Sequence, residues 1–432
     1  MKKTKLILTA VMIDIILTFG HAEAFQAARD TRDNEPVTLG SLLNTALQNN
    51  PGIKALEHRL EASKMMIPQA GALPDPKLSF AIANMPLTDI DFSLEPMTSK
   101  QISVMQKIPF PGINGLKEKI AVENSEISGY SLSGLKLKIV RDVSAGFYDL
   151  YLLDRSVETA EKNLELLDAY IKISRTKYEV GNGIQQDILK AQLEYSRLED
   201  KLITLRSRRR SKVSEINILL NRGTGTPIGK LEEQQHVSSI LNAEDLEQKA
   251  YDNSPVLKSV ETEIKKNEYE IQFSRKQDFP DIDIGIAYSQ REDRRDFISA
   301  QFSMNIPLWK GRKQDMKVEE ALLIKSSSEQ RYEETKNSIR GEIADLVFRL
   351  GETDERIRFL QEIIIPQAEQ SLSSAMEGYR VDKVDFLSLL NSQSVLFNLE
   401  LDYYRLLTEY KKYKIKLEYI TAENINEFSE GE

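Results

Sequence analysis

The side chains able to carry out chemistry are few in this sequence and lie far apart. No cysteine occurs among its 432 residues, which excludes disulfides, thiolate metal sites and a cysteine nucleophile. The three histidines, His21, His58 and His236, are too widely separated to predict a histidine metal site. Methionine sulfur can bind soft metal ions, but methionines as scattered as Met65 and Met105 are more typical of gap-filling side chains.

Motifs of common enzyme classes are also missing from the sequence. It contains no glycine-rich phosphate loop and no GxSxG motif, so we predict that the protein is not an enzyme and uses no cofactor or resident metal ion. The formal net charge is −9. This acidic balance argues against a nucleic acid as the partner.

Residues 1–24 are predicted to form a cleaved signal peptide. Three lysines precede an apolar segment over residues 6–19, and Ala22-Glu23-Ala24 has the small-x-small pattern of a cleavage site. A transmembrane anchor is the alternative, but the segment is short and is interrupted by Asp14. No later run of about 20 apolar residues occurs, so any membrane-spanning part must consist of strands.

Two segments alternate apolar with small or polar residues, as the strands of a β-hairpin do. Strands are predicted at about 281–290 and 297–307, on either side of a charged turn over residues 291–296. A weaker copy places strands at about 77–85 and 100–109. One apolar and one polar face suit a transmembrane hairpin between lipid and water. For one hairpin alone, the alternative is a soluble β-sandwich.

These strands belong to a plan that the chain repeats with an offset of about 200 residues. The predicted order is a first repeat over 25–221, a linker over 222–242, a second repeat over 243–421 and a flexible acidic tail over 422–432. In each repeat a long helical hairpin follows the strands, at about 113–221 and about 312–421. Sustained heptad spacing of apolar residues predicts coiled-coil packing in these hairpins, with a kink at Pro366.

The number of strands decides how such a chain could span a membrane. Four strands are too few for a closed membrane barrel, which needs at least about eight. An open sheet would leave edge N–H and C=O groups unpaired in lipid, so an oligomer must close the barrel. A proline-free helix from Pro111 to Gly181 would be roughly 100 Å long, and must therefore project into water.

With these features the sequence resembles the TolC family of outer-membrane efflux channels. The resemblance covers essentially the whole mature sequence and rests on the duplicated plan and on the Tyr-x-Val-Gly tip at 178–181. The run from Ala70 to Pro76 and the transition from Ile108 to Gly112 are similar to the branch that serves heavy-metal pumps of the resistance–nodulation–division class. The resemblance implies a mainly α protein with a membrane β-barrel. In it, three copies of a four-stranded sheet close a roughly 12-stranded barrel that continues as a periplasmic α-helical coiled-coil tunnel.

The resemblance also implies functional sites at the helical tips. The adaptor-docking motifs correspond to Val180, Gly181 and Asn182 in the first repeat and to Val381, Asp382 and Lys383 in the second. The periplasmic aperture, or gate, corresponds to Asp187, Tyr379, Arg380, Ser388 and Asn391.

Asp187 and Tyr379 match a pair whose hydrogen bond helps to hold the aperture of the family shut. The arginine of that lock is replaced by Val384, and Arg380 is the candidate substitute. Two aperture carboxylates of the family fall on Ser388 and Asn391, which leaves Asp187 as the remaining acidic candidate. The alternative for Asp187 is an acid on the surface of a helix.

The function implied is that of a passive exit duct in a tripartite efflux pump, carrying heavy-metal cations from the periplasm to the exterior. The implied location is the outer membrane of a Gram-negative bacterium, with an extension into the periplasm. Its implied partners are further copies of itself as a homotrimer, outer-membrane lipid, a periplasmic adaptor protein and, through the adaptor, an inner-membrane transporter. The alternatives are a duct for drug efflux or type I protein secretion, and a periplasmic coiled-coil adaptor or scaffold.

Overall fold

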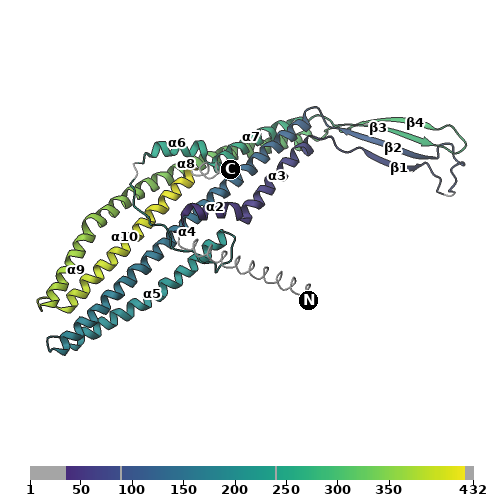
Figure 1. The fold of residues 1–432 in the computed structure, drawn as a ribbon. Helices are drawn as coiled ribbons and strands as arrows, with labels where there is room; N and C mark the ends of the chain where they lie inside the picture. The colour runs from purple at the N-terminus through teal and green to yellow at the C-terminus, as the bar shows by residue number, and fades with distance from the viewer. Residues whose placement is uncertain (1–35, 88–89, 239–240, 424–432) are drawn as a thin grey trace, which may run out of the picture. The chain divides into compact units, whose positions relative to one another are not determined.

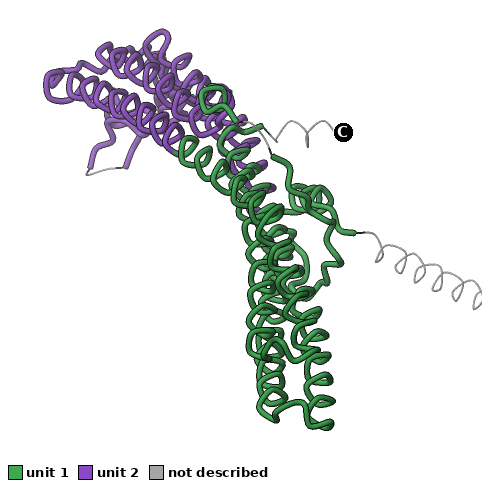
Figure 2. The backbone as a smooth tube through the Cα atoms, turned by 90° about the vertical axis from the view of Figure 1, so that its left-hand side faces the viewer, with its two compact units in different colours: residues 1–51, 136–248, 342–432 green, residues 52–135, 249–341 purple. Residues whose placement is uncertain are grey.

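The structure is a computed structural model that describes residues 36–87, 90–238 and 241–423. The predicted signal peptide and nearly all of the predicted acidic tail lie outside the described residues. The chain divides into two compact units, shown in Figure 2. Unit 1 takes its residues from 1–51, 136–248 and 342–432, and unit 2 takes its residues from 52–135 and 249–341.

Unit 2 contains one antiparallel sheet with the strand order β1-β2-β3-β4 (Figure 1). Its strands are β1 (Lys77–Ala83), β2 (Ser99–Ile108), β3 (Ile282–Gln290) and β4 (Phe297–Met304). The four predicted strands are therefore confirmed. In addition, β2 pairs with β3, with Val104 opposite Ile286, so the two hairpins form one continuous sheet. Strands β1 and β4 are its two edges.

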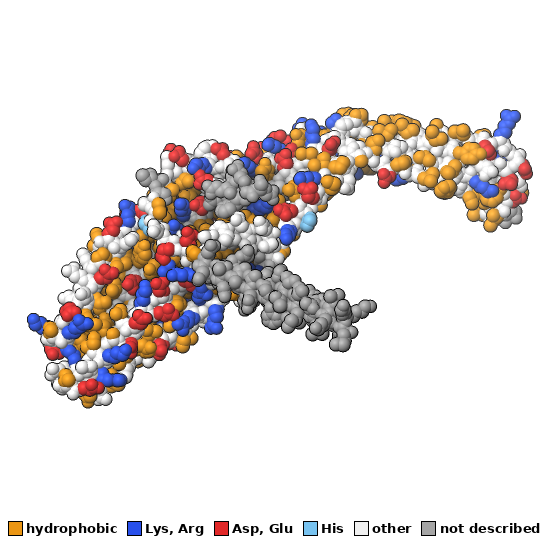
Figure 3. Space-filling model, viewed as in Figure 1, with side chains coloured by type: hydrophobic (Ala, Val, Ile, Leu, Met, Phe, Trp, Pro, Cys, Tyr) orange, Lys and Arg blue, Asp and Glu red, His pale blue; other side chains and the backbone are white. Residues whose placement is uncertain are grey.

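The two faces of this sheet differ in polarity, because successive side chains on a strand point to opposite faces. One row of cross-strand neighbours consists of Phe80, Ile102, Tyr288 and Ile298, all of them exposed. The adjacent row, on the other face, consists of Ser79, Ser103, Ala287 and Ser299. Figure 3 shows apolar side chains gathered over the strands. Such a large exposed apolar area marks a surface that contacts lipid or another protein.

In unit 2, equivalent pairs of helices in the two repeats are joined by equivalent polar contacts. These helices are α3 (Pro51–Gly71), α7 (Pro255–Lys276) and the first parts of α4 (Ile113–Glu179) and α8 (Gln314–Phe359). Ser63 of α3 lies 3.1 Å from Ser125 of α4. At the equivalent place in the second repeat, the amide of Asn267 in α7 donates to Ser328 of α8 at 3.0 Å.

Unit 1 is built from helical hairpins. In Figure 1, α4 runs beside α5 (Gln185–Leu219), and α9 (Ile365–Arg380) runs beside α10 (Phe386–Thr421). A shared core joins these helices and includes Ala160, Leu167, Ala191, Leu198, Leu389 and Phe397. Seven residues separate Ala160 from Leu167 in α4 and Ala191 from Leu198 in α5, which is the heptad spacing of coiled-coil packing. Helices α2 (Leu39–Asn49) and α6 (Ala243–Asn253) are the first helices of the two repeats.

The expected interruption near Pro366 is present. A π-helical turn, η2 (Leu360–Ile364), separates α8 from α9, and Pro366 lies in the first turn of α9. Proline has no N–H to donate and its ring clashes with the carbonyl of the preceding turn, so a wider turn accommodates it. Within residues 36–87, 90–238 and 241–423, no helix is long and apolar enough to cross a membrane.

Candidate functional site at the helical tips

Two tight turns close the helical hairpins of unit 1. The α4–α5 turn covers residues 180–184, and the α9–α10 turn covers residues 381–385. These turns contain the sequence-predicted docking residues and lie next to the predicted gate residues.

The first turn ends α4 with a left-handed residue. Gly181 has φ +78°, and its N–H donates to the carbonyl of Tyr178 at 3.1 Å. The N–H of Asn182 donates to the carbonyl of Lys177 at 2.8 Å. This pair of bonds is a Schellman motif, which satisfies the last carbonyls of the helix and normally uses glycine at the left-handed position.

The second turn has the same backbone without the glycine. Asp382 takes the left-handed position with φ +60°, and its N–H donates to the carbonyl of Tyr379 at 3.4 Å. The N–H of Lys383 donates to the carbonyl of Gly378 at 2.8 Å. The second tip has Asp382 where the first has Gly181. The structure shows that aspartate, which tolerates the left-handed region better than most residues, keeps the same backbone turn.

In each turn, the helix end and the residue after the turn approach closely, and a different member of this pair is glycine in the two turns. In the first, Gly183 packs on Lys177, and a Cβ at residue 183 would lie 3.0 Å from the Lys177 Cβ. In the second, the glycine is at the helix position: a Cβ at Gly378 would lie 2.4 Å from Cγ2 of Val384. Each turn therefore needs one glycine in this pair of positions.

Replacing Gly378 with alanine is expected to destabilise the second tip by about 1–3 kcal/mol, because the added methyl overlaps Val384. The double variant G378A/V384G should recover part of this loss, since it copies the arrangement of the first tip. Hydrogen exchange of the amides around the α9–α10 turn measures the local opening free energy. Gly351→Ala is the control, because nothing lies within 4 Å of a Cβ at that position. Equal protection in G378A and G351A would contradict the steric argument.

Tyr379, in α9, contacts side chains of three other helices in the tip region. Its side chain is buried, and its hydroxyl donates to Oδ2 of Asp187 in α5 at 3.4 Å. The Ser174 hydroxyl of α4 lies 3.1 Å from the same phenolic oxygen. The structure thus brings together the two residues predicted as a gate pair, and both belong to one chain. Phe386 at the start of α10 packs against the Tyr379 ring, with centroids 5.3 Å apart.

Partial burial governs the protonation of this pair. It raises the pKa of the Asp187 carboxyl, and the hydrogen bond from Tyr379 opposes this shift by favouring the charged form. Lys190 and Lys177 also favour the charged form of Asp187, whereas Asp385 disfavours it. Burial likewise raises the pKa of Tyr379. Both shifts favour the protonated form of the group concerned.

Lys177 lies in this site and was missed by the sequence reasoning. Its ammonium group donates to the backbone carbonyl of Tyr379 and forms an ion pair with Asp382. It also lies 4.4 Å from the centre of the Tyr379 ring, within the range of a cation–π contact. Its side chain is only 12% exposed although it is charged. The available signal was its place in the last turn of α4, where a cation is favoured by the helix dipole.

Three predicted gate residues make other contacts. Arg380, the suggested substitute for the missing lock arginine, pairs instead with Glu377 of its own helix at 2.9 Å, and Lys177 holds the cationic position beside Tyr379. Ser388 donates its hydroxyl to Asp385 at 2.8 Å. Asn391 lines a hollow of about 480 Å³ between α5 and α10. Among the described residues, none of these three forms a hydrogen bond or an ion pair with Asp187.

Asp385 starts α10 as a helix cap that α5 lacks. It accepts the backbone N–H of Ser388 at 2.9 Å, and this hydrogen bond lowers the pKa of the Asp385 carboxyl. The equivalent residue in the first repeat is Ile184, which makes no side-chain cap. The two tips are therefore alike in their backbones and different in their polar side chains. Chemically, the arrangement ties two helical hairpins together by a small network of charges and hydrogen bonds.

Comparisons with known proteins agree with this architecture. Residues 42–222 and 246–423 match the model of the family described as outer membrane efflux protein. The chain is 20% identical over 370 residues to the cobalt-zinc-cadmium resistance protein CzcC of Cupriavidus metallidurans, covering 85% of this chain and 86% of that protein.

Two solved structures with the same fold are those of VceC and CusC. The outer membrane protein VceC of Vibrio cholerae aligns with a TM-score of 0.74 at 16% identity, over 89% of this chain and 95% of that one. CusC aligns with a TM-score of 0.75 at 16% identity, over 89% and 91% of the two chains. At these identities the likeness concerns the fold.

Proposed function

Since the chain belongs to the outer membrane efflux protein family and acts as an outer-membrane efflux channel rather than an enzyme, we propose that it is the homotrimeric exit duct of a tripartite pump for heavy-metal cations. The main support for a trimer is the four-stranded sheet, which has an exposed apolar face and two edges, β1 and β4. Edge groups cannot stay unpaired in lipid, so each edge pairs with the opposite edge of the next copy. Three copies close a barrel of roughly 12 strands with the polar face inside.

The tips are the proposed contact with the other pump components. Exposed apolar side chains surround the two turns, namely Val180, Ile184, Leu189, Val381 and Leu387. A periplasmic adaptor docks on this surface and links the duct to an inner-membrane transporter. The Tyr379–Asp187 contact serves as a latch of the periplasmic aperture, and Lys177 supports it by holding the backbone of Tyr379.

The cargo is proposed from the relative whose name states cobalt, zinc and cadmium resistance. The acidic net charge of −9 is compatible with the passage of cations. We further propose that residues 1–24 are removed on export, and that 25–221 and 243–421 are the two copies of a duplicated unit joined by a linker over 222–242.

Deleting the gene in its host is expected to lower the concentrations of Co²⁺, Zn²⁺ and Cd²⁺ that stop growth, and a plasmid copy should restore them. A copy carrying V180D/V381D should not restore resistance, because charge on both tips opposes apolar docking. The control is Val237→Asp, whose side chain is 66% exposed and lies outside the tips.

The outcome distinguishes the possible cargoes. Restoration by V180D/V381D as complete as by V237D would contradict docking at the tips. Unchanged metal sensitivity of the deletion strain, together with increased drug sensitivity or loss of a secreted protein, would contradict metal cargo and favour the corresponding alternative.

A further inference from the structure

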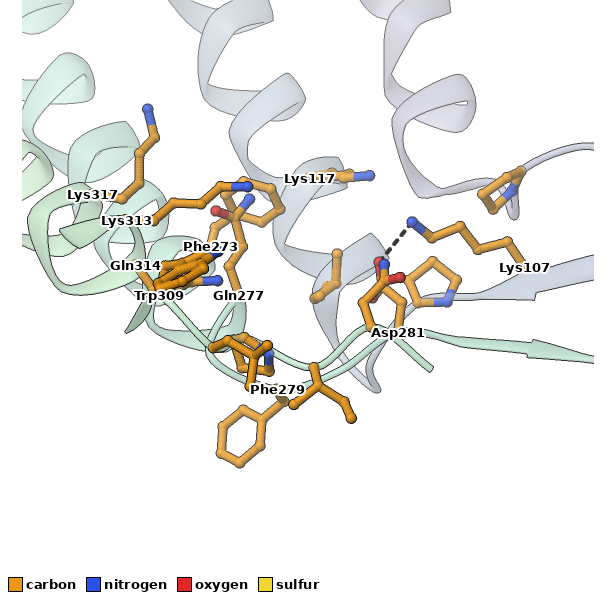
Figure 4. A pocket seen from close by; sticks show the side chains of 17 residues that line it. Lys107, Lys117, Phe273, Gln277, Phe279, Asp281, Trp309, Lys313, Gln314 and Lys317 are labelled. Carbon is orange, nitrogen blue, oxygen red and sulfur yellow. Dashed lines mark ion pairs between the residues drawn. The ribbon is translucent and has the colours of Figure 1, made fainter. Parts of the chain in front are cut away.

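A hollow of about 610 Å³ lies within unit 2 where the strands give way to helices. Its lining comes from both repeats, including Pro109 and Ile113 after β2 and Pro307 and Gln314 after β4. Figure 4 shows the side chains around it. Nothing in the proposed transport function uses this hollow, and its chemistry differs from that of the tips.

The lining is strongly basic. It includes four lysines, Lys107, Lys117, Lys313 and Lys317, against a single carboxylate, Asp281. Lys107 is held by Asp281 at 2.8 Å, and Lys317 pairs with Glu320 at 3.2 Å. Lys117 and Lys313 form no ion pair with any described residue. In Figure 4, Lys313 on one side and Lys107 on the other extend toward the middle of the hollow, with Lys117 between them.

Two further features favour an anion at this place. Ile113 and Gln314, which both line the hollow, are the first residues of α4 and α8, so two helix N-termini face the same region. The partial positive charge of a helix N-terminus stabilises an anion. The side-chain oxygen of Gln314 is buried and accepts no hydrogen bond from the described residues. The site therefore offers an acceptor for a hydroxyl as well as cations for a phosphate.

The rim of the hollow is apolar and exposed. Ile306, Leu308 and Trp309 follow β4 directly and are each more than two-thirds exposed. They extend the apolar face of the sheet, where Phe302 and Met304 of β4 are also exposed. Tryptophan beside lysine at the end of a membrane-spanning segment is typical of the lipid headgroup region. A free phosphate ion would leave this apolar rim exposed to water, whereas the acyl chains of a phospholipid would cover it.

We propose that this hollow binds the phosphate headgroup of an anionic phospholipid, with Lys117 and Lys313 as its ligands and the Trp309 rim against its glycerol and acyl region. The inference rests on the proposed placement of the sheet in the membrane. Bound lipid would fix the depth of the strand–helix junctions in the bilayer. It would also balance the charge of Lys117 and Lys313, which form no ion pair with a carboxylate of the described residues.

Trp309 is the only tryptophan of the chain, so its fluorescence reports on this hollow alone. The full-length protein in a neutral detergent is titrated with dihexanoyl phosphatidylglycerol, dihexanoyl phosphatidylcholine and inorganic phosphate. The emission should shift and saturate with phosphatidylglycerol only. In K117Q/K313Q the affinity should fall by roughly fivefold for each lysine removed. Lys54→Gln is the control, an exposed lysine of unit 2 outside the hollow.

Each alternative result has a definite meaning. An equal response to phosphatidylcholine would exclude recognition of the anionic headgroup. An equal response to inorganic phosphate would show an ion site instead of a lipid site. Unchanged affinity in K117Q/K313Q, with an unshifted emission spectrum before lipid is added, would overturn the assignment of the lysines. Because the titration is made in detergent, its failure is separate from a failure of the membrane location, which fractionation tests.

Discussion

Arginine in place of Ile286 is expected to prevent the protein from accumulating in the outer membrane. Ile286 lies in the middle of β3, between Val104 of β2 and Ala300 of β4, and its side chain is 62% exposed on the apolar face. If that face meets lipid, arginine there costs about 2–4 kcal/mol per chain near the middle of the bilayer. A trimer would carry this cost on every copy, a large part of the stability of an ordinary folded protein.

The matched control is Ser299→Arg on the neighbouring strand. Ser299 is exposed, and its cross-strand partner Ala287 is the residue next to Ile286, so the two positions lie at similar depth on opposite faces. Arginine at residue 299 should be tolerated because the polar face meets water. The measurement is the amount of each variant in the outer-membrane fraction and its oligomeric size in detergent. Equal loss of both variants, or of neither, would contradict the assignment of the faces.

Phenylalanine in place of Tyr379 is expected to raise the conductance of the channel at rest. The substitution removes the hydrogen bond to Asp187 and the contact with Ser174 while keeping the ring against Phe386. A hydrogen bond to a charged group contributes about 1.5–3 kcal/mol, so the open fraction should rise by more than roughly tenfold if the latch holds the aperture. Conductance of the reconstituted protein in planar bilayers measures this change.

Tyr178→Phe is the control, because Tyr178 occupies the equivalent place in the first repeat and is 49% exposed. Its loss should leave the conductance at rest unchanged. Equal conductance of the Tyr379 variant and the unaltered protein would remove the latch from the proposed mechanism. A rise in both variants would show a general loosening of the tips instead.

The same latch predicts a dependence on pH with a defined sign. Partial burial raises the pKa of Asp187 above its ordinary value in the latched arrangement, and opening to water would return it toward that value. The latched form therefore binds the proton more tightly. Acidification through the raised pKa should favour the closed channel, and a rise in pH should remove this contribution. In D187N this part of the pH dependence should be absent.

Local features of the fold could be read from the sequence because they depend on neighbours in the chain. Alternation in Ile282–Tyr288 predicts a strand whatever it pairs with, and the absence of proline between Pro111 and Gly181 permits one helix from Ile113 to Glu179. The Tyr-x-Val-Gly pattern marks a helix end, since glycine costs least at a left-handed position. The pairing of Tyr379 with Asp187 came from resemblance, because spacing alone does not reveal it.

The sequence could not predict which residues contact each other when they lie far apart in the chain. Alternation gives β2 and β3 two faces each but does not specify that Val104 lies opposite Ile286. Nothing near Lys177 in the sequence indicates Asp382, because that contact exists only once two helical hairpins are packed side by side.

The chain by itself determined that there are four strands, long coiled-coil helices and two similar tips, since each follows from periodicity, proline or glycine. Only the tertiary structure decided that Lys177 holds the cationic position expected of Arg380, and that lysines from both repeats share one hollow beside Trp309. The reason is physical: a charged side chain on a helix can reach several neighbours with similar ease. Which of them it contacts is set by how distant segments pack against one another.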